Sequence, residues 1–288
     1  MTPGESFSAG LGAFDTIAAA DHDDAAIDPR CVPFLLHHGR ATDRAIVLFH
    51  GFTNCPRQFA AFAQLLFERG FNVYVPRFPR HGMRDKLTPQ LAGLTAAEIS
   101  DCATRSLKIT AQLGAHVSVL GLSAGATAAA WLAQTRAFDC VVAIAPFFSV
   151  VRIPALLEPA LTAVLALAPN LELWWDPRVK QNAEPRHAYP RFSTHALAQC
   201  LKLGETVRSL AHTDAPRSAR SILVLNAKDP AIDNAAASAV WQLWRARGGT
   251  TDTYTFENLD VRHDIIEPVT YPDAITLVYP VLLELLAA

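Results

Sequence analysis

Short apolar runs alternate with helix-like stretches along most of this 288-residue chain. The runs are AIVLFH (45–50), FNVYVP (71–76), HVSVL (116–120), CVVAIAP (140–146), SILVLNA (221–227) and TDTYTFEN (251–258). Runs of this length are typical of strands buried on both faces. Between them, Phe59, Phe62 and Leu66 repeat at helical spacing, and Thr95 with Glu98 matches a capping box. The alternation predicts an α/β fold, with a mostly parallel central sheet and helices on both faces.

Two stretches depart from this alternation. Residues 1–30 are small, polar and acidic, with little periodicity, and we predict an irregular leader. Residues 147–213 are too long for a crossover and contain six prolines, so we predict a helical cap (lid) insertion. The core would then consist of residues 31–146 and 214–288. The apolar stretch IPALLEPALTAVLALAP (153–169) is too short and proline-broken to span a bilayer, so we expect a buried or pocket-lining cap helix and no transmembrane segment.

The composition narrows the classes of partner. Apolar residues make up 51% of the chain and charged residues 18%, which allows a sizeable core and argues against wholesale disorder. The net charge is −2, and no basic stripe or polybasic tail is present, so we expect no nucleic-acid partner.

The cysteines indicate neither a zinc site nor a disulfide framework. The five are odd in number, widely spaced and without a CxxC pair: Cys31, Cys55, Cys102, Cys140 and Cys200. We expect mostly buried thiols in a reducing compartment. The N-terminus does not read as a signal peptide, and we predict a cytoplasmic location.

The strongest chemical signal is Gly121-Leu122-Ser123-Ala124-Gly125, a GxSxG motif between a predicted strand and a predicted helix. That setting is the one a nucleophile elbow needs, because the tight turn lifts the serine hydroxyl above the sheet at a helix N-terminus. The alternative is an ordinary serine N-cap between two glycines. We interpret Ser123 as a nucleophile.

A serine hydroxyl needs a base, and the base needs an orienting acid. Asp229 directly follows the predicted strand 221–227, so we expect it at the same sheet edge as Ser123. Asp233 is the rival acid, but it suits the N-cap of the next helix. His263 lies in the loop after the last strand and is our predicted base. Asp260 and Asp264 flank it, and we interpret both as structural or solvated.

Acyl transfer also needs donors for a developing oxyanion. The backbone N–H of Ala124, next after the nucleophile, is one candidate. The loop His50-Gly51-Phe52-Thr53 follows an early strand, and we choose the Phe52 N–H as the second. We interpret His50 and His81 as structural. His37 and His38 are adjacent on a predicted strand and would point to opposite faces, which excludes a bidentate metal site.

Taken together, five motifs resemble the α/β-hydrolase superfamily. They are HGFT at 50–53, VPRFPRHG at 75–82, GLSAG at 121–125, KDP at 228–230 and RHD at 262–264. Their order and spacing are similar to those of the carboxylesterase and monoacylglycerol-lipase-like branch, which includes serine aminopeptidase-like hydrolases. The resemblance covers about residues 30–146 and 215–288.

The resemblance implies an α/β-hydrolase fold, a triad of Ser123, Asp229 and His263, an oxyanion hole at Phe52 and Ala124, and no cofactor or metal. One departure is Ala126, where many relatives carry a second glycine.

The function expected from these residues is hydrolysis of a small-molecule carboxylic ester through an acyl-enzyme. The apolar cap, with Trp174 and Trp175, favours an apolar acyl or alkyl group. The alternative is that the two tryptophans form the core of the cap, which is the more common role of aromatic residues. Three alternatives stay open at this point: an amidase or peptidase, a carbon–carbon bond hydrolase, and a non-catalytic binding module that retains the pocket. The sequence does not indicate an oligomeric state.

Overall fold

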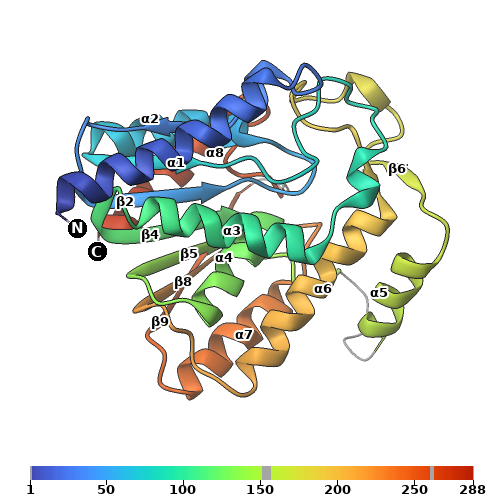
Figure 1. The fold of residues 1–288 in the computed structure, drawn as a ribbon. Coiled ribbons are helices and arrows are strands. Elements are labelled where there is room, and N and C mark those ends of the chain that lie inside the picture. Colours follow the sequence, from blue (N-terminus) through green and yellow to red (C-terminus); the bar gives the residue numbers. More distant parts are fainter. Residues whose placement is uncertain (1, 151–156, 260–262, 288) are drawn as a thin grey trace.

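The computed structural model describes residues 2–150, 157–259 and 263–287, and its centre is a seven-stranded sheet with helices on both faces (Figure 1). The strand order is β1-β3-β2-β4-β5-β8-β9. β1 is antiparallel to β3, and every other neighbouring pair is parallel. The predicted fold class is therefore confirmed. The strands are β1 (Phe34–Leu36), β2 (Thr42–Phe49), β3 (Phe71–Val75), β4 (Gly114–Leu122), β5 (Cys140–Ile144), β8 (Arg220–Asn226) and β9 (Thr251–Phe256).

The helices form one layer on each side of the sheet. On one side, α2 (Ala60–Glu68) lies beside α8 (Pro272–Ala287), and the rings of Phe62 and Tyr279 are 5.1 Å apart between centroids. On the other side, neighbouring helices pack in succession (Figure 1). These helices are α3 (Ala96–Thr110), α4 (Ala124–Thr135), α6 (Thr194–Ala211) and α7 (Asn234–Ala246). The capping box is confirmed, because Thr95 and Glu98 accept each other's backbone N–H groups.

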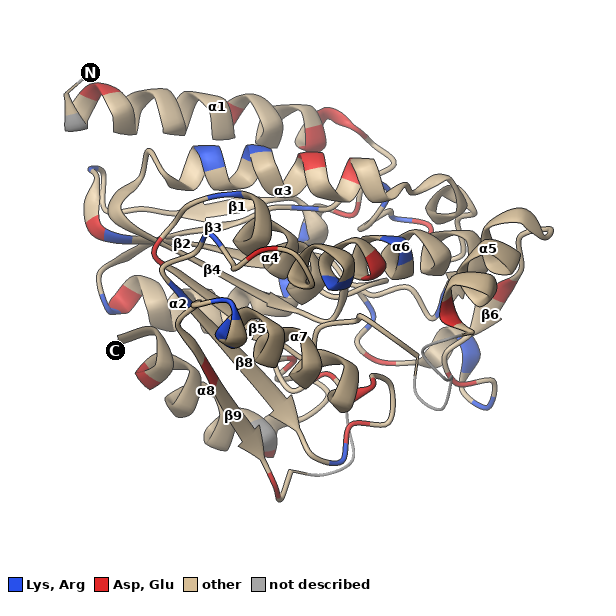
Figure 2. Ribbon diagram, turned by 90° about the horizontal axis from the view of Figure 1, so that it is seen from below, with Lys and Arg blue, Asp and Glu red and all other residues tan. Residues whose placement is uncertain are grey.

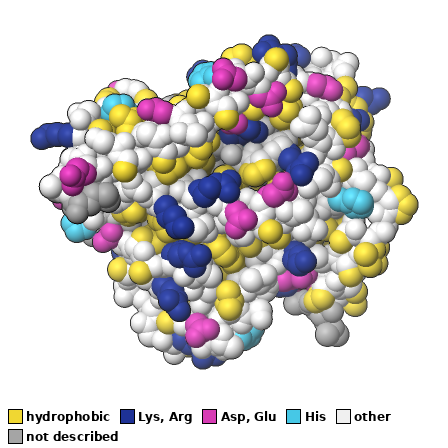
Figure 3. Space-filling model, in the orientation of Figure 1, with side chains coloured by type: hydrophobic (Ala, Val, Ile, Leu, Met, Phe, Trp, Pro, Cys, Tyr) yellow, Lys and Arg dark blue, Asp and Glu magenta, His cyan; other side chains and the backbone are white. Residues whose placement is uncertain are grey.

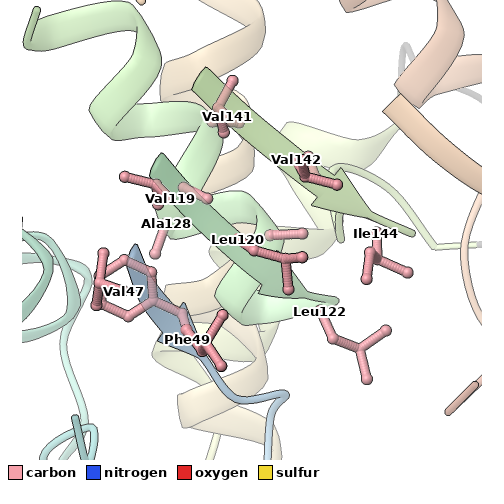
Figure 4. Close-up of a cluster of buried hydrophobic side chains, with 14 of the residues drawn as sticks. Val47, Phe49, Val119, Leu120, Leu122, Ala128, Val141, Val142 and Ile144 are labelled. Atoms are coloured by element: carbon pink, nitrogen blue, oxygen red, sulfur yellow. The ribbon is translucent and has the colours of Figure 1, made fainter. Parts of the chain in front are cut away.

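The core lies between these layers, where the middle strands are apolar on both faces. Figure 4 shows side chains from β2, β4 and β5 packed together with Ala128 of α4. Val119, Leu120, Val142 and Ile144 have no exposed surface. Burying a side chain of this size stabilises the fold by roughly 1.5–3 kcal/mol. This rigid centre sets the positions of the loops at the carboxyl ends of its strands.

The prediction of an irregular leader is wrong, because residues Pro3–Asp23 form a helix, α1. Thr2 caps it by accepting the Glu5 N–H. The buried Phe7 joins the core, and the Asp21 carboxylate pairs with Arg77 at 2.6 Å. α1 packs on α3 and so adds an outer helix to that side of the molecule.

The expectation for the cysteines is only partly right. Cys31 and Cys55 form a disulfide, with their Cα atoms 5.3 Å apart, whereas Cys102, Cys140 and Cys200 are free. Cys31 ends the 3₁₀ helix η1 (Pro29–Cys31), and Cys55 directly precedes η2 (Pro56–Phe59), which contacts η1. The pair is 24 residues apart, and no local pattern signals that the two turns meet.

The segment predicted as a cap contains both helices and strands. Its described elements are α5 (Glu158–Leu167), β6 (Glu172–Trp174), the 3₁₀ helix η4 (Lys180–Asn182), β7 (Arg191–Ser193) and α6. β6 and β7 form a separate two-stranded antiparallel sheet. α6 packs on α4 and α7 and so belongs to the helix layer on that side of the main sheet. Residues 151–156 of this segment lie outside the described residues.

The expectation of a buried or pocket-lining cap helix is wrong for α5. Val164 is 60% exposed and Leu167 86% exposed. Figure 3 shows yellow side chains along the edge where Figure 1 places α5. α5 contacts α6 rather than the sheet, which leaves most of its apolar surface in solvent. None of the helices in the described parts of the chain is long and apolar enough to cross a membrane.

Candidate active site

Ser123 lies at the turn between β4 and α4. Its φ is +58° and its ψ −118°, a strained backbone conformation for a residue with a side chain. A Cβ on Gly121 would collide with the Gly125 backbone, and one on Gly125 would collide with the Phe49 backbone. Both positions therefore require glycine. The helix α4 begins at Ala124, so Ser123 stands at its positive end.

Asp229 lies three residues beyond the end of β8, and backbone groups hold its carboxylate. Its Oδ1 accepts hydrogen bonds from the Ala231 N–H at 2.8 Å and the Ile232 N–H at 3.3 Å. The side chain has no exposed surface. This arrangement fixes the direction of the second oxygen, Oδ2.

His263 follows β9 and faces this second oxygen. Its Nδ1 lies 2.8 Å from Asp229 Oδ2. Because an ionised carboxylate can only accept, Nδ1 carries the proton and Nε2 is left as the basic nitrogen. The imidazole is 26% exposed, and His263 lines the same cavity as Ser123. The neighbouring Asp260, interpreted above as structural or solvated, lies outside the described residues.

The rival acid Asp233 has a different environment. Its Oδ1 accepts the N–H groups of Ala235 and Ala236, so it caps α7 as expected. Asp264, interpreted as structural or solvated, is structural: burial raises its pKa, and its carboxylate accepts hydrogen bonds from Gln58, Ile266 and Glu267.

Hydrogen bonds of His50 fix the direction of the Phe52 N–H in the loop after β2. The Gly51 carbonyl lies 2.9 Å from His50 Nδ1, and His50 Nε2 accepts the Phe78 N–H at 3.1 Å. His50 is therefore neutral, with its proton on Nδ1, and burial holds its pKa well below the usual value. In a trans peptide the N–H points opposite to the C=O, so the Phe52 N–H points away from His50. Within the described residues, neither the Phe52 nor the Ala124 N–H donates to another protein atom.

A cavity of about 460 Å³ contains Ser123 and His263. Aromatic side chains from separate elements line it, among them Phe52, Phe147, Trp175, Tyr189 and Phe192. Trp175 Nε1 donates to Thr53 Oγ1 at 2.9 Å, and the Tyr189 N–H donates to the Thr53 carbonyl at 2.8 Å. These two bonds attach the segment after α5 to the Phe52 loop. Trp174, which the sequence suggested together with Trp175 as part of an apolar cap, does not line the cavity.

His50 and His81 are structural, as expected. His81 Nδ1 lies 2.9 Å from the Pro79 carbonyl, and burial lowers the His81 pKa to about 4. His37 lies against the Phe7 ring and His38 stacks on Phe67, so the two do not share a ligand site. Among the described residues, no group of His, Cys, Asp and Glu could hold a metal ion.

Charge is distributed without a dominant patch on the faces in view. Figure 2 shows basic and acidic residues scattered over helices and loops, and Figure 3 shows both signs interspersed with apolar side chains. The site itself combines an apolar wall with a few polar groups. That combination is typical of cavities for small organic ligands.

Several solved structures share this fold. The structure of the metagenome-derived lipolytic enzymes LipS and LipT matches with a TM-score of 0.68 at 19% identity, covering 90% of this chain and 98% of that one. A monoacylglycerol lipase from Paleococcus ferrophilus matches with 0.66 at 16% identity, covering 88% and 97%. An enol-lactonase from Burkholderia xenovorans LB400 matches with 0.56 at 17% identity, covering 89% and 96%. At these identities the likeness concerns the fold alone.

Sequence comparison gives the family. No curated protein matches the chain. The family model described as the alpha/beta hydrolase family matches residues 46–275, which include the end of β2, the Ser123 turn, β8, β9 and His263. The chain therefore belongs to the alpha/beta hydrolase family.

Proposed function

We propose that this chain is a serine hydrolase that cleaves carboxylic esters through an acyl-enzyme. The observation that carries the proposal is the 2.8 Å contact between His263 Nδ1 and Asp229 Oδ2, at the cavity that Ser123 also lines. A histidine oriented by a buried carboxylate beside a serine on a strained turn is the arrangement that activates a hydroxyl nucleophile. Lipases, a carboxylesterase and a lactonase among the structural neighbours agree with ester chemistry.

In the first half of the proposed reaction, Ser123 Oγ attacks the ester carbonyl carbon while His263 Nε2 takes the hydroxyl proton. The Asp229 carboxylate stabilises the resulting imidazolium. The carbonyl oxygen becomes an oxyanion, and the N–H groups of Phe52 and Ala124 donate to it. When the tetrahedral intermediate collapses, the carbon–oxygen bond to the alcohol breaks, and the alcohol leaves with the proton from His263.

In the second half, water replaces the alcohol. His263 Nε2 takes a proton from water, and the oxygen attacks the acyl carbon of the Ser123 ester. The same two N–H groups hold the second oxyanion. Collapse releases the carboxylic acid and returns the proton to Ser123 Oγ. The cycle uses only side chains and backbone groups of this chain, together with water.

The cavity favours an apolar acyl or alkyl group. Aromatic rings make up much of its wall, and burial of an apolar group against them is favourable at about 25 cal/mol per Å². Of residues 147–213, expected to form the cap, we propose that those before α6 do so, with Trp175 and Tyr189 contributing to the cavity wall, whereas α6 belongs to the helix layer of the sheet. The cytoplasmic location and the absence of a nucleic-acid partner stay predictions.

The test is hydrolysis of p-nitrophenyl butyrate by the wild type and by Ser123→Ala. We expect turnover by the wild type and a loss of roughly 10⁵–10⁶-fold in the variant, because the nucleophile is gone. Ser100→Ala on α3 is the matched control and should keep full activity, since Ser100 Oγ contacts only the Ala97 carbonyl. Near-normal turnover by Ser123→Ala would exclude the proposed mechanism. Covalent labelling by a fluorophosphonate tests the reactivity of Ser123 without an ester substrate.

A further inference from the structure

One buried side chain connects the two loops that meet at the cavity. Gln58 lies in η2 and is 2% exposed. Its Oε1 accepts the Gly51 N–H at 2.8 Å, and its Nε2 donates to Asp264 Oδ2 at 2.6 Å. Gly51 belongs to the loop after β2, whereas Asp264 lies 206 residues from Gln58 and directly follows His263. The Gln58 amide therefore spans from the oxyanion loop to the histidine loop.

The chemistry of the two ends fixes the orientation of the amide. A backbone N–H can only donate and a carboxylate can only accept, so the carbonyl oxygen must face Gly51 and the NH₂ group must face Asp264. The other carboxylate oxygen, Asp264 Oδ1, accepts the N–H groups of Ile266 and Glu267, each at 3.1 Å. Among the described residues no lysine or arginine pairs with Asp264, so three N–H donors hold this buried charge.

The bridge ends beside the two groups whose separation matters most. Gly51 N–H is one peptide unit before the Phe52 N–H, and Asp264 is the residue after His263. Oxyanion donors act only at about 2.7–3.1 Å from the developing charge. A displacement of about 1 Å between donor and base can cost 10²-fold in rate. A hydrogen-bonded connection between the two loops would therefore affect the rate of acyl transfer, because it fixes the distance between the oxyanion donor and the base.

We propose that Gln58 and Asp264 are positioning residues that hold the Phe52 N–H and the His263 imidazole at a fixed separation. The inference rests on the proposed function, because it assigns the pair a role in the same reaction. Both residues also line the cavity, but the role proposed here acts through the Phe52 N–H and His263. Their contribution should therefore appear in kcat more than in KM.

The test exchanges the two polar groups. In Gln58→Glu, the new carboxylate faces that of Asp264. In Asp264→Asn, the NH₂ group of the new amide faces the NH₂ group of Gln58, so one of the two donors has no acceptor. In the double variant, the new carboxylate at position 58 accepts from the Gly51 N–H and from the NH₂ group of the new amide at position 264, so the bridge is rebuilt with the charge moved across it. We expect each single variant to lose about 10- to 100-fold in kcat with KM changed less than about 3-fold, and the double variant to recover to within about 5-fold.

The pH profile separates positioning from a general loss of stability. At low pH the two carboxylates of Gln58→Glu can share a proton, which restores the connection. The kcat of Gln58→Glu relative to the wild type should therefore rise as the pH is lowered. Gln64→Glu on α2 is the matched control, because Gln64 is exposed and faces Glu68 at 3.0 Å. It introduces a similar pair of carboxylates away from the cavity and should keep wild-type kcat at every pH.

The kcat values of the single and double variants test the positioning role, and Ser123→Ala tests the proposed function. Single variants with wild-type kcat, or a folded double variant that stays as slow as the singles, would overturn the positioning role. If the single variants do not fold, the kcat of the double variant alone decides. Ser123→Ala is run in the same assay: activity that survives this change refutes the proposed function, whereas its loss leaves the Gln58 result to be judged by itself.

Discussion

Asp229 and Asp233 are two carboxylates in one loop, but only Asp229 has a side-chain partner from another loop. Asp229 divides its oxygens between two backbone N–H groups and His263, and its side chain is fully buried. Asp233 bonds only the first turn of α7. The first residue can therefore orient an imidazole, whereas the second stabilises a helix end.

We predict that Asp229→Asn lowers kcat by about 10⁴-fold with little loss of stability. An amide NH₂ facing His263 Nδ1 would favour the wrong tautomer, which leaves Nε2 protonated and unable to accept from Ser123. Asp233→Asn should keep wild-type activity, because asparagine caps a helix as well as aspartate does. Ester hydrolysis and thermal unfolding of both variants check this. Equal activity of the two variants would argue against Asp229 as the orienting acid.

At the residue scale, sequence order predicted more than spacing alone. Ser123, Asp229 and His263 each follow a recognisable strand, so their approach to one sheet edge follows from the parallel topology. Gln58 gave no such signal, because one glutamine in a short turn is common and its partner is far away in sequence. Asp264 was interpreted as structural or solvated because adjacent residues rarely point at each other, and it is structural. No local pattern indicated its partner Gln58, which accounts for the missed connection.

At the element scale, α1 shows why a real helix can look irregular. Its buried or half-buried residues recur at helical spacing, at Phe7, Gly10, Leu11, Phe14, Ile17 and Ala18. Gly4, Gly10 and Gly12 weaken the pattern, since glycine costs about 1 kcal/mol in a helix relative to alanine. Contact with α3 and the Asp21–Arg77 pair compensate for this low propensity, and neither is visible in the local sequence.

Two glycines of α1 provide a matched test of that contact. Gly12 is exposed and a Cβ there would meet nothing within 4 Å, so Gly12→Ala should stabilise the protein by about 0.5–1 kcal/mol. At Gly10 a Cβ would lie 2.9 Å from Gln112 Cβ and 3.3 Å from the Ile109 carbonyl oxygen. Gly10→Ala should therefore destabilise it, by about 1 kcal/mol or more. Denaturant unfolding measures both, and equal stabilisation by the two changes would mean that α1 does not pack on α3.

At the scale of the whole molecule, the sheet could be predicted from the sequence, whereas the contacts between segments far apart in the chain could not. Apolar runs of strand length are local signals, and alternation with helices leaves few topologies. The Cys31–Cys55 disulfide and the attachment of Trp175 to Thr53 join segments that only the completed fold brings together. The exposed surface of α5 belongs to the same class, because its apolar sequence predicts burial that its position does not provide.

Two buried neutral histidines couple the folded state to pH. Burial lowers the pKa of His81 to about 4 and holds that of His50 well below its usual value of 6.5. In the unfolded chain both titrate near 6.5, so below that pH the unfolded state binds more protons than the folded state. The stability that these groups contribute is therefore fully present above about pH 6.5 and is lost as the pH falls toward 4.

We predict that His81→Gln flattens this loss. Between about pH 6 and pH 4.5 the free energy of unfolding of the wild type should fall relative to that of the variant by about 1.4 kcal/mol per pH unit, because the variant takes up one proton fewer on unfolding. Contributions of groups that do not interact with His81, including the raised pKa of Asp264, cancel in this difference. The exposed His212→Gln is the control and should keep the wild-type slope. Denaturant unfolding across this range checks it, and parallel curves for His81→Gln and the wild type would mean that folding does not lower the pKa of His81.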